Sequence, residues 1–90
     1  MFGIFYSTQF KKDFKRIEND KHKVKKLESA IEILIKEGNL KAKKFKTHNL
    51  KGEYEGDFEA HITPDFLLIW YVVDNIIYLS RTGSHSELFK

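Results

Sequence analysis

The chain has 90 residues and a net charge of +3, and 41% of its residues are hydrophobic. This length suits one domain spanning residues 1–90 and leaves no room for a large internal cavity, while the apolar content argues against disorder. Cysteine is absent, which excludes disulfide scaffolds, thiolate metal sites and cysteine nucleophiles and favours a cytoplasmic protein. The apolar run Phe66–Val73 is too short to cross a membrane, so no membrane partner is expected.

The charge is divided unevenly along the chain. Residues 1–51 carry 14 Lys and Arg against 6 Asp and Glu, whereas residues 52–90 carry 2 against 7. A basic half of this kind attracts polyanions, including nucleic acid, or an acidic protein partner. The plainer alternative is a solvated helix surface.

The first half of the chain predicts a strand followed by a helical hairpin. Gly3–Ser7 is apolar and aromatic, as in a short strand, and Thr8 is a plausible helix N-cap. Apolar residues then recur at helical spacing in two stretches separated by Asn19-Asp20, and Gly38 is a typical helix terminator. The two apolar stripes are Phe10, Phe14 and Ile17, and Val24, Leu27, Ile31 and Leu34.

The second half predicts a basic loop and then strands. Residues 39–53 show no clean period and are expected to form the loop. Alternation from about Tyr54 to Ile62 predicts a strand that ends at the turn Thr63-Pro64-Asp65. Phe66–Val73 is apolar on both faces and is therefore expected to be a central strand, with Trp70 and Tyr71 in the core.

The last segment predicts a hairpin and a short helix. Asp74-Asn75 is a two-residue turn signal before the strand Ile76–Thr82. Ser84 and Glu87 have the spacing of a capping box, which predicts a turn of helix near the C-terminus.

These elements together predict an α+β fold in the order β-α-α-β-β-β. The helical hairpin packs on one face of a small, mainly antiparallel sheet, and a short helical turn ends the chain. Two helices cover only one face of such a sheet. The other face is therefore expected to be partly open and to carry the functional site.

Five residues in the second half are candidates for catalysis. His48 lies in the basic loop, His61 shares a strand face with Glu59, and Asp65 follows the only proline. Arg81 and His85 lie at the exit of the last strand. Strand exits and turns are places where reactive groups are displayed.

Each candidate also has a plain structural interpretation. His48, His61 and His85 could be ordinary surface histidines. Arg81 could pair with Glu59 or Glu87, and Asp65 could serve only to form its turn.

Taken together, three His, an Arg and an Asp suit metal-free cleavage of RNA. The 2′-hydroxyl must lose a proton and the 5′-oxygen must gain one, and His can serve as base or acid near neutral pH. Arg offers a permanent charge and a donor fork for the phosphorane. A zinc site is the competing use of the same residues, but no two of these His have the i, i+4 spacing of a helical zinc motif.

Three segments carry a resemblance to a known family. The chain resembles the YafQ branch of the RelE superfamily, the ribosome-dependent mRNA endonuclease toxins of bacterial toxin–antitoxin modules. The resemblance rests on three runs that follow one another at family-like spacing: Lys46-Thr47-His48-Asn49-Leu50-Lys51-Gly52, Ala60-His61-Ile62-Thr63-Pro64-Asp65-Phe66-Leu67-Leu68-Ile69-Trp70, and Arg81-Thr82-Gly83-Ser84-His85-Ser86-Glu87-Leu88-Phe89.

The resemblance implies a RelE-like fold, no cofactor, an antitoxin partner, and cleavage of mRNA on the ribosome. Promoter DNA would be bound only through the antitoxin complex. The implied roles are general acid for His85, activation of the 2′-hydroxyl by His48 or Asp65, stabilisation of the phosphorane by Arg81, and orientation of the nucleotide by His61. The implied RNA-binding residues are Phe89 and, in the basic segment, Lys43, Lys44, Lys46 and Lys51.

One departure from the family pattern supports an alternative function. Family members commonly carry Arg a few residues before the strand His, where this chain has Phe58, and acidic residues precede that position. The alternative is a toxin homologue with weak nuclease activity that acts chiefly as an antitoxin-bound, DNA-binding autorepressor.

Overall fold

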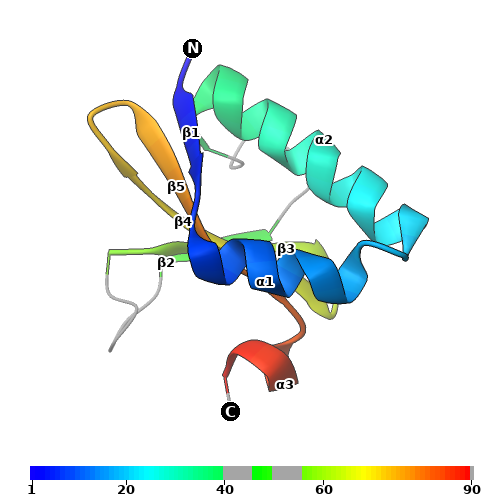
Figure 1. Ribbon diagram of the computed structural model, residues 1–90. Helices are drawn as coiled ribbons and strands as arrows, with labels where there is room; N and C mark the ends of the chain where they lie inside the picture. Colours follow the sequence, from blue (N-terminus) through cyan, green and yellow to red (C-terminus); the bar gives the residue numbers. More distant parts are fainter. Residues whose placement is uncertain (40–45, 50–55, 90) are drawn as a thin grey trace.

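The computed structural model describes residues 1–39, 46–49 and 56–89, with residues 46–49 described by their backbone. The predicted α+β fold is confirmed, and one strand is added to it. In chain order (Figure 1) the elements are β1 (Gly3–Tyr6), α1 (Thr8–Ile17), α2 (Lys21–Glu37), β2 (Lys46–Asn49), β3 (Phe58–Thr63), β4 (Phe66–Val73), β5 (Ile76–Gly83) and α3 (His85–Leu88).

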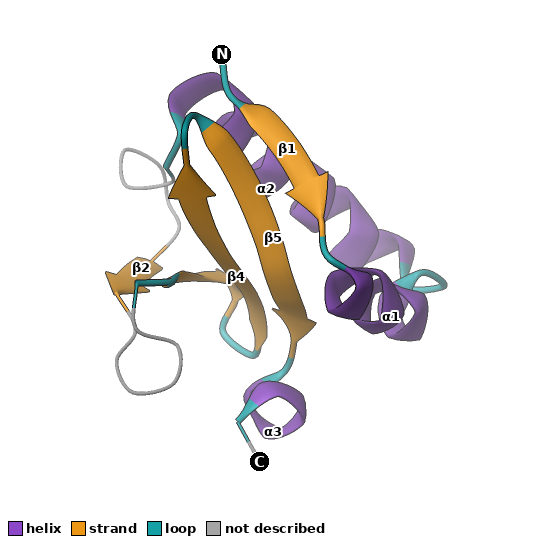
Figure 2. Ribbon diagram, turned by 60° about the vertical axis from the view of Figure 1, so that its left-hand side comes forward, coloured by secondary structure: helices purple, strands orange, loops and turns teal. Residues whose placement is uncertain are grey.

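The strands form one sheet in the order β1-β5-β4-β3-β2. β1 runs parallel to β5, and the other neighbours are antiparallel. The helices α1 and α2 lie together on one side of this sheet, whereas α3 stands apart from them near the C-terminus (Figure 2). The prediction of a central strand is confirmed, since β4 is third of five.

The ends of the helices follow the predicted signals closely. Ser7 caps α1, one residue before the expected Thr8, and its hydroxyl accepts a hydrogen bond from the Phe10 N–H at 2.9 Å. Asp20 caps α2 in the same way, and Gly38 ends that helix in the left-handed conformation with φ of 77°. None of the helices in the described part of the chain is long and apolar enough to span a membrane.

The core lies between the helix pair and one face of the sheet. Leu27, Ala30 and Leu34 of α2 pack with the inner residues of the strands, among them Leu68 and Trp70 of β4. On the opposite face a second, smaller cluster forms from Leu67, Ile69 and Leu88. The prediction for Trp70 is confirmed, but that for Tyr71 is wrong: Tyr71 is 37% exposed and stacks on Tyr78 on the outer face.

The basic loop predicted for residues 39–53 is wrong at residues 46–49. These residues form the edge strand β2, which pairs with β3 from Lys46 opposite His61 to Asn49 opposite Phe58. Because β2 is polar and only four residues long, it has no apolar alternation that would predict a strand. The strand forms because its backbone pairs with that of β3. β3 itself begins at Phe58, later than the expected Tyr54.

β4 and β5 form the predicted hairpin, and Asp74 and Asn75 make its two-residue turn. Asp74 and Asn75 have φ of 50° and 64°, so both residues adopt the left-handed conformation that a type I′ turn requires. Asn and Asp accept this conformation more readily than other non-glycine residues. The turn therefore fixes the register of the two longest strands.

Gly83 ends β5 and begins the short connection to α3, so a substitution there should affect how α3 is held on the sheet. Its φ of 149° disfavours other residues, and an added Cβ would lie 2.9 Å from Glu87 Oε1. We expect Gly83→Ala to lower the free energy of unfolding by about 1–3 kcal/mol and to displace α3 from the sheet. Urea unfolding and amide exchange of α3 would measure both effects.

Gly3→Ala is the matched control. A Cβ at Gly3 would lie 3.5 Å from Ile76 Cγ1 and 4.0 Å from Asn75 O, both ordinary contact distances, so the substitution should be close to neutral. Equal losses from the two substitutions would show that the connection at Gly83 has no special constraint.

Candidate active site on the open face of the sheet

The site is built from rows of residues that face one another across the strands. On the face opposite α1 and α2, Arg81 of β5 pairs with Ile69 of β4, and Ile69 pairs with Glu59 of β3. In the adjacent row Gly83 pairs with Leu67, and Leu67 pairs with His61. Residues two apart on a strand point to the same face, so Glu59 and His61 lie side by side.

His61 and Glu59 form a close pair. His61 Nε2 lies 3.2 Å from Glu59 Oε1, and the two side chains are 23% and 9% exposed. A carboxylate oxygen at this distance restrains the orientation of the imidazole ring. The predicted candidate His61 therefore sits in a defined polar environment.

His85 is brought to the same place by α3. Its ring centroid lies 5.5 Å from that of His61 and 6.0 Å from that of Phe89. Its Nδ1 lies 3.8 Å from Asp65 Oδ1, but the two side chains are 50% and 79% exposed. The last contact is therefore weak in water. Four of the predicted site residues, His61, Asp65, His85 and Phe89, thus gather in one cluster.

The position of His85 depends on how α3 is anchored. The Ser84 hydroxyl accepts a hydrogen bond from the Glu87 N–H, and the Glu87 carboxylate accepts one from the Ser84 N–H at 2.8 Å, so the predicted capping box is confirmed. Leu88 is buried against Leu67 and Ile69. A four-residue helix is not stable alone, and these contacts hold it on the sheet.

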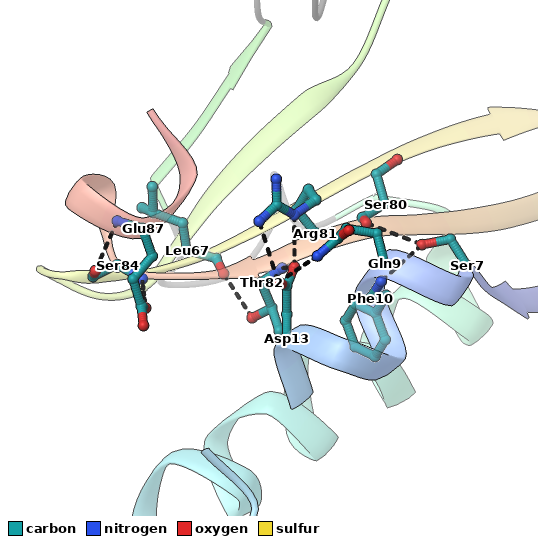
Figure 3. A network of polar contacts seen from close by, with 10 residues as sticks. All are labelled: Ser7, Gln9, Phe10, Asp13, Leu67, Ser80, Arg81, Thr82, Ser84 and Glu87. Atoms are coloured by element: carbon teal, nitrogen blue, oxygen red, sulfur yellow. Dashed lines mark hydrogen bonds and ion pairs between the residues drawn. The ribbon is translucent and has the colours of Figure 1, made fainter. Parts of the chain in front are cut away.

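The side chain of Arg81 extends to the edge of the sheet, where it forms an ion pair with Asp13. Its Nε donates to Asp13 Oδ2 at 2.7 Å, and Nη2 donates to Asp13 Oδ1 at 3.2 Å (Figure 3). Asp13 belongs to α1 and is 1% exposed. Asp13 is therefore a partner of Arg81, in addition to the Glu59 and Glu87 considered from the sequence.

Two of the predicted site residues, Lys46 and His48, lie in β2, and their pairing with β3 is known. Lys46 pairs with His61, and His48 pairs with Glu59, which places both residues of β2 at the ends of the two rows. Three further predicted RNA-binding residues, Lys43, Lys44 and Lys51, lie outside the described residues.

Three neighbouring side chains of the site could hold a metal ion. Glu59, His61 and His85 each offer one ligand atom, and these atoms lie within 4.8 Å of one another. Two imidazoles and a carboxylate suit zinc or copper among the biological metals. The same groups can therefore serve proton transfer or metal binding.

Two residues of the site, Glu59 and Asp13, have no functional role predicted from the sequence. The alternation of β3 already placed Glu59 on the face of His61. Asp13 carried a signal as well, because it interrupts the apolar stripe of Phe10, Phe14 and Ile17 on one face of α1. An acidic residue on the buried face of a helix needs a cationic partner.

Comparison with known proteins shows a consistent family. Residues 2–90 match the sequence model of "Bacterial toxin of type II toxin-antitoxin system, YafQ". A relative in Escherichia coli (strain K12), "mRNA interferase toxin YafQ", is 34% identical over 86 residues, which cover 96% of this chain and 94% of the relative.

Solved structures agree with the sequence comparison. A copper-bound mutant toxin from Helicobacter pylori has a TM-score of 0.86 and 36% identity, with 99% of this chain and 100% of that chain covered. The YafQ chain of an E. coli DinJ–YafQ complex has a TM-score of 0.84 and 31% identity, with both chains fully covered.

The capping box predicts a dependence of α3 on pH. The hydrogen bond from the Ser84 N–H holds the pKa of Glu87 below its ordinary value, although partial burial opposes this shift. A lowered pKa in the folded state adds stability at neutral pH, and this stability is lost as the pH falls from the ordinary Glu range through the folded pKa. Solvent screens the group, so the loss should stay below about 1 kcal/mol.

Glu87→Gln tests this dependence, because the amide keeps an acceptor and loses the charge. Urea unfolding of both proteins between pH 3 and pH 7 should show a smaller acid-induced loss of stability in the variant. Parallel pH profiles would mean that the charge of Glu87 does not stabilise α3.

Proposed function

The chain belongs to the YafQ family of bacterial toxins of type II toxin–antitoxin systems, and from this premise we propose that it is a metal-independent endoribonuclease that cleaves mRNA on the ribosome. The observation that supports this most directly is the cluster of His61 and His85 beside two carboxylates. Cleavage of RNA at the 2′-hydroxyl needs one group to remove a proton and another to supply one. An imidazole and a neighbouring carboxylate in one cluster, His85 and Asp65, can divide these tasks.

His85 is the best candidate for the general acid. Half of its side chain is exposed, so a leaving 5′-oxygen can reach it, and Asp65 Oδ1 lies 3.8 Å from its Nδ1. Asp65 or His48 would then accept the proton of the 2′-hydroxyl. His61, held by Glu59, would orient the nucleotide.

Arg81 and Phe89 suit the remaining tasks. The Arg81 guanidinium carries a permanent charge that can stabilise the phosphorane. The ring of Phe89 is 39% exposed beside His85, and an exposed ring of this kind can stack on a base. The lysines Lys43, Lys44, Lys46 and Lys51 would add phosphate contacts, whose strength falls steeply with salt.

A cognate antitoxin is the expected protein partner. DinJ and YafQ of E. coli form a complex, and we propose that this chain pairs with an antitoxin in the same way in the cytoplasm. Promoter DNA would be bound only through that complex. The alternative, a homologue with weak nuclease activity that acts mainly in repression, is an outcome of the first test below.

A second candidate role for the same cluster is metal binding. The Helicobacter pylori relative is copper-bound, and Glu59, His61 and His85 bring their ligand atoms within 4.8 Å. A metal ion on these groups would occupy the lone pair of His85 and prevent it from carrying a proton. Metal binding would therefore inhibit the nuclease rather than support it.

Primer extension on an mRNA translated by purified ribosomes tests the enzymatic proposal. The wild-type protein should cut within translated codons, and His85→Ala should reduce the rate by roughly 10²- to 10⁴-fold, because it removes the acid. His22→Ala is the control, since His22 is exposed in the first turn of α2 and should leave the rate unchanged.

The outcomes separate the two functions. Absence of cleavage by the folded wild type, with promoter binding by the antitoxin complex, would reject the nuclease and support the repressor. Equal cleavage by the wild type and His85→Ala would reject the assigned acid.

Phenanthroline tests the metal, because it removes transition metals and spares the Mg²⁺ that ribosomes require. It should leave cleavage at the untreated rate, whereas added Cu²⁺ should inhibit. Glu59→Gln should need about 10- to 100-fold more Cu²⁺ for the same fractional inhibition, because one charged ligand is lost. Loss of cleavage in phenanthroline, with recovery on adding metal back, would instead show a metal-dependent hydrolase.

A further inference from the structure

Asp13 is the most deeply buried charged residue in the described part of the chain, and the proposed mechanism does not use it. Only 1% of its surface is exposed. Its carboxylate accepts four hydrogen bonds, from Gln9 Nε2, from Nε and Nη2 of Arg81, and from the backbone N–H of Thr82. A buried carboxylate is costly unless it is paired and bonded in this way, so its placement calls for a reason.

The first part of the reason lies in the sheet. β1 pairs with β5 from Ile76 to Leu79, and beyond Leu79 none of the described strands lies beside that edge of β5. Polar groups of α1 and its N-cap occupy that edge: Ser7 donates its hydroxyl to Ser80 O at 3.0 Å, and Asp13, in the middle of the helix, accepts the Thr82 N–H at 3.2 Å. α1 thus replaces a strand along the end of β5.

The second part of the reason is a β-bulge at Ser80. Trp70 pairs with Leu79 and Ile69 pairs with Arg81, so Ser80 has no opposite residue. Simple alternation would place Arg81 on the inner face with Ile77 and Leu79. The extra residue moves it to the side of Ile69, in the row that leads to Glu59. The bulge therefore turns Arg81 away from the core. The hydrogen bonds to Asp13 then determine where the guanidinium of Arg81 lies.

The two hydrogen bonds to Asp13 fix both the position and the orientation of the Arg81 guanidinium. Asp13 binds it side-on through Nε and Nη2, and the third nitrogen points away from the carboxylate (Figure 3). A bidentate contact of this kind restrains both the position and the plane of the fork. Arg81 still keeps 21% of its side chain exposed, against 1% for Asp13. A phosphate can therefore approach Arg81 but cannot reach Asp13.

We propose that Asp13 is a positioning residue for the nuclease, which acts through Arg81. It holds the guanidinium at the edge of β5, beside the row of Arg81, Ile69 and Glu59. The backbones of Arg81 and Glu59 are two strands, roughly 10 Å, apart, so a phosphate bound between this edge and the pair of His61 and His85 would meet the guanidinium. The charge of Asp13 also offsets part of the charge of Arg81, so its contribution is orientation rather than attraction. This inference rests on the proposed function and goes beyond it.

The decisive experiment measures single-turnover cleavage of ribosome-bound mRNA at increasing toxin concentration. Asp13→Asn should lower the rate at saturation by about 10- to 100-fold, because a displaced guanidinium no longer meets the phosphorane. The half-saturating concentration should change little. Asp20→Asn is the matched control: the same substitution at the N-cap of α2, where Asn caps equally well, should leave the rate unchanged.

A double-mutant cycle separates positioning from a purely structural ion pair. If Asp13 acts through Arg81, Asp13→Asn should have almost no further effect on the saturating rate once Arg81→Ala is present. Equal factors in both backgrounds would overturn the proposal. Arg81→Ala with an undiminished rate would instead reject the proposed role of Arg81 itself, and with it the premise.

Two measurements keep the test valid if Asp13→Asn does not fold. Arg81→Lys retains Asp13 and the positive charge but loses the fork, so it should lose nearly as much activity as Arg81→Ala. Retention of most of the wild-type rate by Arg81→Lys would overturn the proposal. In the wild type, the Arg81 Nε–H signal in NMR spectra should exchange slowly with water, and rapid exchange would likewise count against a fixed guanidinium.

Discussion

The burial of β4 on both of its faces is the constraint on which the rest of the structure depends. Leu68 and Trp70 point into the core beneath the helix pair, whereas Leu67 and Ile69 point to the other side and receive Leu88 of α3. A strand that is apolar on both faces must lie centrally in the sheet and be covered twice. The helix pair supplies one cover, and the short helix α3 supplies the other.

The packing of α3 on the outer face of β4 brings the residues of the site together. Because α3 is anchored on Leu67 and Ile69, its first residue, His85, lies beside His61 of β3. The neighbouring strand position carries Glu59, and the far edge of the same row carries Arg81. The chemistry of the site thus depends on apolar packing just beneath it. The site lies on the open face of the sheet, where a rigid strand and a small helix provide the required precision.

Phe58 has an explanation in the same alternation. It stacks on Trp70 with a centroid distance of 5.7 Å and packs against the core beneath the helices. The residue that departs from the family pattern therefore contributes to the inner face, next to Glu59 on the outer one. Glu59 is paired with His61 on the outer face. This pairing offsets the repulsion that an isolated carboxylate would exert on RNA.

The sequence by itself determined the elements whose signals are local. Helix stripes, caps at Asp20 and Gly38, the Asp74-Asn75 turn and the capping box of α3 all depend on residues a few positions apart, where chain geometry is short-ranged. The resemblance of three short runs also indicated the family and the five catalytic candidates. Only the tertiary structure decided the rest. β2 exists because β3 lies beside it, and Arg81 reaches the outer face because of a bulge that alternation does not reveal. Its partner, Asp13, is 68 residues away in the chain, and a contact at that separation depends on how helix and sheet pack together.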